Sequence, residues 1–463
     1  MIKHFHALYQ APRSMSSLKR FSWRRFAMYK HSVRLDKRKC VGCTSCIKVC
    51  PTEAIRVQMG KAKIMEDSCI DCGRCITACP HHAMISVTTP LAAMADHKFN
   101  IVVVASTFYT QFQTIAAPEE VYSGLYSLGF DSIYEEARAS EILAEALRKH
   151  LRSENAIFPV ISTSCPVIPR LVTTLYPNLI DNLSPFLPSN EIAARIAKNE
   201  FCEMFGVDAS EVGVYYISPC SAEMAHVRAP LGTKKSTIDG VFSVRDVYAK
   251  LVSIIESSKN KGPVCTIPYP AGAFGLGTAV VGGLSSAVGT EHYLAVDGID
   301  NVCQCLEEIE NERITGLHLL EPLTCSGGCV GGPLNFENQF VAKNRSRRIA
   351  NSQPRLDLEH DEHVQKYVGS SLIRYDEAFE PRSILRLSDD VAEAARMMEK
   401  LEEVNRQLPG LDCGSCGSPT CRTLAEDIVR GYAVEMDCIF KLRDKVRIMA
   451  QEMVDLAGAH KRG

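Results

Sequence analysis

The alternation of apolar and polar segments over residues 97–343 predicts an α/β domain. Short apolar runs with the length and composition of buried strands are separated by amphipathic stretches with helical spacing. The strand-like runs are residues 100–105, 156–161, 212–217 and 316–320. The helical stretches include residues 135–151 and 190–204. Strands that alternate with helices favour a mostly parallel sheet covered by helices.

The pattern changes after residue 343. The charged stretch 344–387 has no clear periodicity, which predicts a linker. Residues 388–463 predict a small helical domain. Its first helix, at 389–407, has one apolar face, and Pro409-Gly410 breaks the chain after it. That face comprises Val391, Ala394, Met398, Leu401 and Val404. A closing helix at 439–457 would serve as a partner surface or as a cap.

Length and charge narrow the class of protein. A chain of 463 residues, 46% of them hydrophobic, exceeds one ordinary core and predicts two to four domains. Its formal net charge of −2 argues against a dedicated nucleic-acid binder or a binder of anionic membranes. The fully apolar runs are much shorter than the ~20 residues of a membrane helix, so no membrane span is expected.

The first 33 residues carry seven Lys and Arg and no acid, which predicts a separate basic tail at 1–33. An organellar presequence has this composition. We favour a mobile tail, or a true start at Met28, because a targeting assignment needs more than composition.

Twenty cysteines dominate the chemistry of the chain. Disulfide-dense chains are usually small and secreted, and no secretory signal with an apolar centre is evident. The cysteines are bunched at short intervals, which favours metal ligation in a reducing compartment, here the cytoplasm.

Residues 34–90 hold two consecutive C-x2-C-x2-C-x3-C-P runs, the spacing of ferredoxins with two 4Fe-4S clusters. Three thiolates of each run reach one cube, and the fourth opens a short helix and ligates the other cube. One predicted ligand group is Cys40, Cys43, Cys46 and Cys79. The other is Cys50, Cys69, Cys72 and Cys75. Zinc knuckles, the alternative, use pairs of cysteines rather than two runs of four. The expected function of this segment is electron transfer.

Three cysteine motifs follow strand-like runs of the central segment. They are Thr163-Ser164-Cys165-Pro166, Ser218-Pro219-Cys220-Ser221-Ala222-Glu223 and Leu323-Thr324-Cys325-Ser326-Gly327-Gly328-Cys329-Val330-Gly331-Gly332-Pro333. Ligands of parallel sheets gather where strands end in loops, and glycines let the backbone approach a bulky cofactor. We therefore expect the four loop cysteines to meet at one site. Inert burial, the other interpretation, suits the isolated Cys202, Cys265, Cys303 and Cys305.

These three motifs resemble the signature loops of FeFe hydrogenases. The flanking sequence extends the resemblance over about 240 residues, including LGFDSIYE at 128–135 and TIDGVFSVRDV at 237–247. The resemblance implies an FeFe-hydrogenase-like α/β domain at 97–343 that holds an H-cluster, a 4Fe-4S cube joined to a diiron unit. By motif, Cys165, Cys220 and Cys325 would ligate the cube, and Cys329 would bridge the cube to the diiron unit.

Two positions depart from the best-known catalytic members of that family. Those members carry a proton-relaying Cys where this chain has Ser164, and a hydroxyl is a poorer acid–base group than a thiol. They carry a Lys that donates to a cyanide ligand where this chain has Glu223. A carboxyl donates only when it is protonated. The third loop reads GGPLN, which resembles a divergent branch associated with sensing.

A further cysteine set lies near the C-terminus, in a C-x2-C-x4-C-x16-C pattern: Cys413, Cys416, Cys421 and Cys438. It predicts a third separate 4Fe-4S cluster, with Cys438 presented from the helix that follows Cys421. Zinc is the alternative, since four-cysteine sets serve both metals. The set resembles the small Fe-S domain appended to sensory and divergent FeFe hydrogenases.

Three functions fit these patterns. The first is an FeFe-hydrogenase-like oxidoreductase that performs reversible proton reduction, with a ferredoxin or another redox subunit as partner. The second is a sensor of hydrogen or redox state, which Ser164 and Glu223 favour. The third is an iron–sulfur scaffold that lacks the diiron unit. Glu145 is one candidate proton carrier for the first function.

Overall fold

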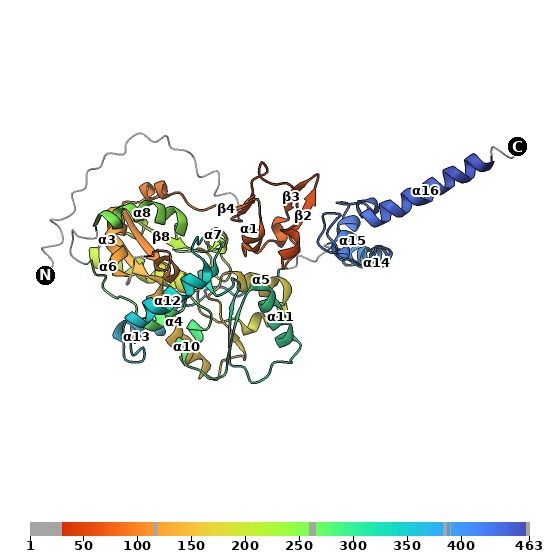
Figure 1. The fold of residues 1–463 in the computed structure, drawn as a ribbon. Helices are drawn as coiled ribbons and strands as arrows, with labels where there is room; N and C mark the ends of the chain where they lie inside the picture. The colour runs from red at the N-terminus through yellow and green to blue at the C-terminus, as the bar shows by residue number, and fades with distance from the viewer. Residues whose placement is uncertain (1–29, 114–117, 259–264, 383–386, 389, 460–463) are drawn as a thin grey trace.

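The computed structural model describes residues 30–113, 118–258, 265–382, 387–388 and 390–459. The predicted basic tail therefore lies almost entirely outside the described residues. Three parts follow one another along the chain: a ferredoxin module, a central α/β domain and a C-terminal module. The ferredoxin module lies between the other two, as Figure 1 shows. The predicted fold class, a multidomain α/β protein with a ferredoxin-like module and a small helical domain, is confirmed.

The ferredoxin module is built on two antiparallel strand pairs. Strand β1 (Val33–Leu35) pairs with β4 (Met84–Ser86), and β2 (Ile55–Gln58) pairs with β3 (Lys61–Ile64). Met59 and Gly60 join β2 to β3, and both have positive φ, as a tight hairpin turn requires. The short helices of the module are η2 (Ile47–Val49), η3 (Glu66–Ser68) and α1 (Arg74–Ala78).

The central domain contains two parallel sheets. The larger has the order β6-β5-β8-β9, and the smaller has the order β10-β11-β7. The larger sheet consists of β5 (Phe99–Val104), β6 (Ser132–Glu135), β8 (Val212–Ser218) and β9 (Gly240–Ser243). The smaller consists of β7 (Val160–Ile161), β10 (Tyr293–Asp297) and β11 (Leu319–Leu323). Every residue of β8 is buried, which explains its continuous apolar run.

Helices cover both sheets. They are α2 (Ser106–Tyr109), α3 (Glu119–Ser127), α4 (Glu136–Leu151), α5 (Val167–Leu175), α6 (Ser189–Phe205), α7 (Ser221–Arg228), α8 (Val244–Ser258), α9 (Ala273–Gly277), α10 (Gly283–Val288) and α11 (Ile299–Glu310). Helix α4 is the most central, because its residues 137–147 are all buried. Buried Glu and Arg side chains on α4 are paired, as in the ion pair of Arg138 with Glu141 at 3.0 Å.

Helix α9 packs against α4 at Gly275, where a Cβ would lie 2.1 Å from the carbonyl oxygen of Ala137. We expect Gly275→Ala to lower the free energy of unfolding by at least about 2 kcal/mol, because a backbone contact must open. Gly277→Ala is the control, since its Cβ meets nothing within 4 Å and the substitution favours helix. Thermal unfolding of both variants checks the prediction, and equal melting temperatures would contradict it.

The predicted linker at 344–387 is wrong for most of its length. Helix α12 (Gln339–Ser352) crosses its start, and α13 (Glu362–Val368) and η8 (Ser371–Ile373) follow. Val364, Tyr367 and Ile373 are buried in the main core of the central domain. Asp361 also pairs with the buried Arg138 at 2.5 Å. The high charge of this stretch reflects polar faces and buried ion pairs rather than an unstructured connection.

The C-terminal module consists of α14 (Val391–Gln407), α15 (Cys421–Val429), η9 (Glu435–Asp437) and α16 (Ile439–Ala459). Helix α14 buries only the end of its predicted apolar face, at Leu401 and Val404, whereas Val391 is 84% exposed. Helix α16 projects away from the rest of the molecule (Figure 1). No helix in the described part of the chain has the length and apolar character needed to cross a membrane.

Candidate metal centres

Each predicted ligand group of the ferredoxin module surrounds one recess. The first recess is lined by Cys40, Cys43, Cys46 and Cys79, together with Val57. The second is lined by Cys50, Cys69, Cys72 and Cys75. Each recess thus receives its fourth cysteine from the other run, which is the arrangement that the spacing predicts.

The position of that fourth cysteine differs from the expectation. Cys50 lies at the end of η2 and Cys79 at the end of α1, so each closes a short helix instead of opening one. The residues that follow then turn back toward the sulfur. The Ala54 amide donates to Cys50 Sγ at 3.2 Å, and the Ala83 amide donates to Cys79 Sγ at 3.3 Å. Backbone donors to sulfur fit thiolate ligands of an iron–sulfur cluster.

A buried carboxylate, which the sequence did not single out, organises the second recess. Asp71 accepts from the backbone amides of Ser32 and Val33, and Nδ1 of His31 lies 2.6 Å from its Oδ2. Although burial opposes ionisation, these contacts with His31 and the amides lower the pKa of Asp71 below its usual range. Asp71 therefore ties the start of the described chain to the loop between Cys69 and Cys72.

The three central cysteine loops each begin where a parallel strand ends. Cys165 lies between β7 and α5, and Cys220 is the residue before α7, separated from the end of β8 by Pro219 alone. Cys325 and Cys329 follow β11, and Cys329 begins the short helix η7 (Cys329–Gly331). The carboxyl ends of parallel strands are where such folds place their ligands.

The four thiols of these loops converge. Burial raises the pKa of the Cys220 thiol well above its usual range, and the neighbouring Glu223, Cys325, Cys165 and Cys329 raise it further. Burial and the nearby Cys165 likewise raise the pKa of Cys325 to about 12. Such thiols form thiolates only beside a compensating cation, which the iron of a cluster supplies. The donor set therefore fits an iron–sulfur group.

Two glycines let the third loop approach its neighbours closely, one at the second loop and one at the segment between α9 and α10. A Cβ on Gly332 would lie 2.5 Å from the carbonyl oxygen of Pro219, and the Leu334 amide donates to that same oxygen at 2.9 Å. A Cβ on Gly328 would lie 2.7 Å from the backbone nitrogen of Val281, and Gly328 has a φ of +98°. The glycine-rich sequence around Cys325 and Cys329 thus serves close backbone packing.

The two departures from the hydrogenase pattern lie beside this cysteine cluster. The Ser164 hydroxyl accepts a hydrogen bond from the Ser162 hydroxyl at 3.1 Å. Glu223 is buried on α7, and its carboxyl accepts a 2.6 Å hydrogen bond from Asn190. Burial, reinforced by the nearby Glu136, raises the pKa of Glu223 to about 8.

Glu136 is a site residue that sequence reasoning missed. Its carboxyl accepts from the Ser189 hydroxyl at 2.7 Å and from the Tyr216 hydroxyl at 2.8 Å. Burial raises its pKa, and its charge contributes to the raised pKa of both Glu223 and the Cys329 thiol. Its position at the start of α4, directly after β6, was the available signal. Glu145, the candidate carrier, instead pairs with Arg148 at 2.5 Å.

The second ferredoxin recess adjoins the central cysteines. A Cβ on Gly73 would lie 2.6 Å from Ser221 Oγ and 2.7 Å from Pro333 Cγ, so this loop packs between the second and third central loops. Burial raises the pKa of the Cys72 thiol, and the nearby thiols of Cys50 and Cys325 raise it further. The Ser221 hydroxyl also donates to the Asp71 carbonyl at 2.9 Å.

The C-terminal cysteines lie together in their own module. Cys416, Cys421 and Cys438 belong to one small cluster of apolar contacts. Burial raises the pKa of the Cys416 thiol, and the nearby thiols of Cys438 and Cys413 raise it further. Cys438 comes from the end of η9, beside α16, rather than from the helix that follows Cys421. Cys413 is exposed.

Three protein families match separate parts of the chain. Residues 32–80 match the 4Fe-4S dicluster domain, and residues 408–440 match a family described as a putative Fe-S cluster. Residues 98–291 match the C-terminal domain of the iron-only hydrogenase large subunit. That match ends before the third cysteine loop.

Known relatives are distant. Iron hydrogenase 1 of Clostridium pasteurianum is 24% identical over 297 residues, which is 53% of this chain and 50% of the relative. The NADP-reducing hydrogenase subunit HndD of Solidesulfovibrio fructosivorans is 23% identical over 342 residues, 63% of this chain and 55% of the relative. The chain thus spans about half the length of the curated relatives it matches. A solved variant of the FeFe hydrogenase HydA1 from Chlamydomonas reinhardtii aligns with a TM-score of 0.47 at 15% identity, over 64% of this chain and 98% of that one.

From the N-terminus, the chain matches an iron–sulfur dicluster family, then a hydrogenase family, then a second iron–sulfur family, one for each of its three cysteine-bearing parts. Both relatives carry the name of a hydrogenase. The chain is therefore a hydrogenase-like iron–sulfur protein: its central part is similar to iron-only hydrogenases, and its two flanking parts are similar to iron–sulfur cluster domains.

Proposed function

We propose that the protein is a redox enzyme that interconverts hydrogen with two protons and two electrons. The observation that carries this proposal is that four thiols from three distant loops lie close enough to raise one another's pKa. Cys165, Cys220 and Cys325 would hold a 4Fe-4S cube, and Cys329 would bridge it to a diiron unit. When bound, such an H-cluster supplies the redox chemistry of hydrogen, and the protein supplies position, protons and electrostatics.

The protein's own contribution at this site is proton handling, and it favours slow turnover. Ser164 takes the place of a relaying thiol, and a hydroxyl exchanges protons less readily near neutral pH. Glu223 takes the place of an ammonium donor and is held by Asn190. Glu136 adds a second, partly buried carboxyl to the same region, bound by two hydroxyls. These residues would position and exchange protons around the site.

Electron supply would use the remaining cysteines. Each group of four in the ferredoxin module would hold a 4Fe-4S cluster, and the C-terminal set would hold another. The packing of Gly73 against Ser221 and Pro333 supports a connection between the second group and the hydrogenase-like site. Because a cluster of this kind carries one electron at a time, the partner would be a one-electron donor or acceptor protein.

A non-catalytic sensor of hydrogen or redox state is the second candidate. Ser164 and Glu223 favour it, because both lower the expected turnover without removing a cysteine ligand. Loss of the diiron unit, with the cubes retained, would make the protein a scaffold instead.

Infrared spectroscopy on the full chain, matured with the hydrogenase maturation enzymes, tests the proposal. We expect bands from CO and cyanide ligands, together with hydrogen turnover above that of unmatured protein. Bands without turnover would support the sensor. No bands, with roughly sixteen iron atoms per chain from four cubes, would overturn both and leave the scaffold.

A further inference from the structure

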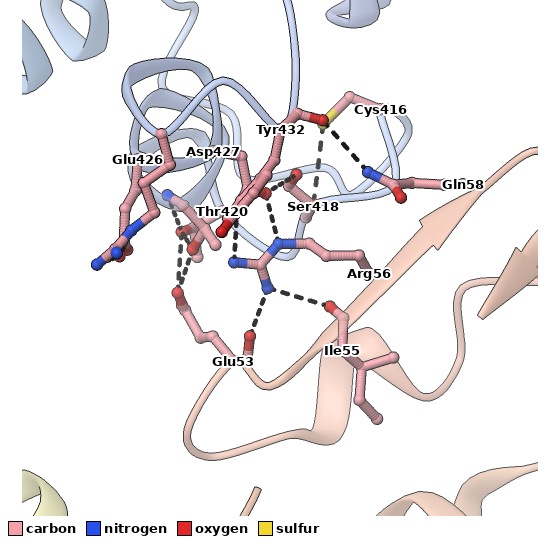
Figure 2. Close-up of polar contacts among 12 residues, drawn as sticks. Glu53, Ile55, Arg56, Gln58, Cys416, Ser418, Thr420, Glu426, Asp427 and Tyr432 are labelled. Carbon is pink, nitrogen blue, oxygen red and sulfur yellow. Dashed lines mark hydrogen bonds and ion pairs between the residues drawn. The ribbon is translucent and has the colours of Figure 1, made fainter. Parts of the chain in front are cut away.

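A buried ion pair joins the C-terminal module to the ferredoxin module. Arg56 on β2 donates two hydrogen bonds to the carboxylate of Asp427 on α15, from Nε to Oδ2 at 2.5 Å and from Nη2 to Oδ1 at 3.1 Å (Figure 2). The two side chains are only 10% and 5% exposed. Ser418 donates to Asp427 at 3.0 Å, and Arg56 also donates to the carbonyl of Glu53. Buried charges of this kind are stable only where hydrogen-bond partners satisfy them. The fully partnered ion pair therefore indicates a specific interface between the two modules.

The backbone forms a second part of the same interface. The Val57 amide donates to the Gly417 carbonyl at 2.8 Å, so the C-terminal loop takes up an unpaired amide at the open edge of β2. A Cβ on Gly417 would lie 1.9 Å from the Val57 carbonyl oxygen. Only glycine permits this approach. Glu53 also accepts from Thr420 (Figure 2). It accepts from the Thr423 hydroxyl as well.

These contacts bring two cysteine groups side by side. Gly417 directly follows Cys416, and Val57 lines the recess of the first ferredoxin group. A Cβ on Gly414, next to Cys413, would lie 3.2 Å from Cδ1 of Ile47, which directly follows Cys46. The cysteine groups therefore lie in series: the C-terminal set, the first ferredoxin group, the second ferredoxin group and the central site.

From this series we infer that the C-terminal module is the outer end of the electron relay, and that the Arg56–Asp427 pair with Gly417 locks it in place. The inference rests on the cluster assignments of the proposed function. A one-electron donor protein would deliver two electrons there in two separate steps. Formation of one hydrogen molecule from two protons consumes both electrons, and oxidation of hydrogen returns them by the reverse route.

Amide exchange in the full chain tests the lock. We expect Asp427→Ala to speed exchange of the Val57 amide by about a hundredfold or more, because an unpaired buried Arg56 opens the interface. Glu426→Ala is the matched control: it removes the neighbouring acid of α15, whose partner Arg430 lies within the same module. Unchanged exchange in Asp427→Ala, or equal acceleration in both variants, would overturn the lock.

Electron paramagnetic resonance on the reduced, iron-loaded chain tests the relay. Wild-type protein should show spin coupling between the C-terminal cluster and a ferredoxin cluster. Gly417→Ala should abolish the coupling without lowering iron per chain. Gly410→Ala, whose φ is also left-handed but whose Cβ meets nothing within 4 Å, should keep it. Absence of coupling in wild type, or coupling that survives Gly417→Ala, would overturn the inference. Because neither the amide-exchange nor the resonance experiment needs the diiron unit, their results are independent of the infrared test.

Discussion

Replacing Ser164 by Cys and Glu223 by Lys in one chain should raise hydrogen turnover by about a hundredfold or more, since a well-placed proton relay contributes on that scale. The thiol titrates nearer to neutral pH than the Ser164 hydroxyl. The ammonium would donate where Glu223 now accepts from Asn190, and the nearby Glu136 supplies a countercharge for it. Hydrogen evolution by matured full-length protein, driven by a chemical reductant, is the measurement.

Two single variants separate position from chemistry in this experiment. Ser162→Cys adds a thiol two residues away on the same loop and should leave turnover near the wild-type rate. Glu223→Gln removes the carboxylate without adding a cation and should give less gain than Lys. If the double variant and wild type evolve hydrogen equally fast, the roles assigned to Ser164 and Glu223 are wrong.

Replacing Cys329 by Ala should remove the CO and cyanide bands of the matured protein and abolish hydrogen turnover. The loss should exceed the roughly 10- to 100-fold effects of changing residues that merely support a metal ligand. The reason is that Cys329 is the proposed bridge between the cube and the diiron unit. Electron paramagnetic resonance signals of the ferredoxin and C-terminal clusters should persist, because their cysteines belong to other modules.

Cys305→Ala is the matched control for that variant. Cys305 is buried, at 8% exposed, and lies on α11 in the same apolar cluster as Cys165. No converging cysteines surround it among the described residues, so the bands should remain. Bands that survive Cys329→Ala would remove Cys329 from the proposed site.

The proposed cluster ligands match the hydrogenase pattern, whereas the residues proposed to handle protons do not. Every cysteine that the electron relay and the central site require is present, and the recesses and loops are arranged around them. Ser164 and Glu223, the residues proposed to handle protons beside the site, are the ones that differ from the hydrogenase pattern.

Cysteine spacing in the sequence was enough to predict both ferredoxin ligand groups and the C-terminal set, because ligand spacing is a local property of the chain. The strands at β5 and β8 and the helices α4 and α6 were also predictable, since their apolar periodicity is local. The folded structure of residues 344–387, which the sequence predicts as a linker, was not predictable in this way. Val364 and Ile373 are buried in the main core of the central domain. The many charged residues around them in the sequence obscured the apolar pattern that would have predicted this.

The sequence by itself determined which cysteines are candidates to bind iron, where several main strands and helices lie, and which two positions depart from the hydrogenase pattern. Only the tertiary structure decided which groups meet: Glu136 with the central cysteines, Gly73 with Ser221, and Arg56 with Asp427. The partners in the last pair are 371 residues apart. No local pattern encodes such a pair, because its stability comes from burial and geometry that exist only after the modules have packed.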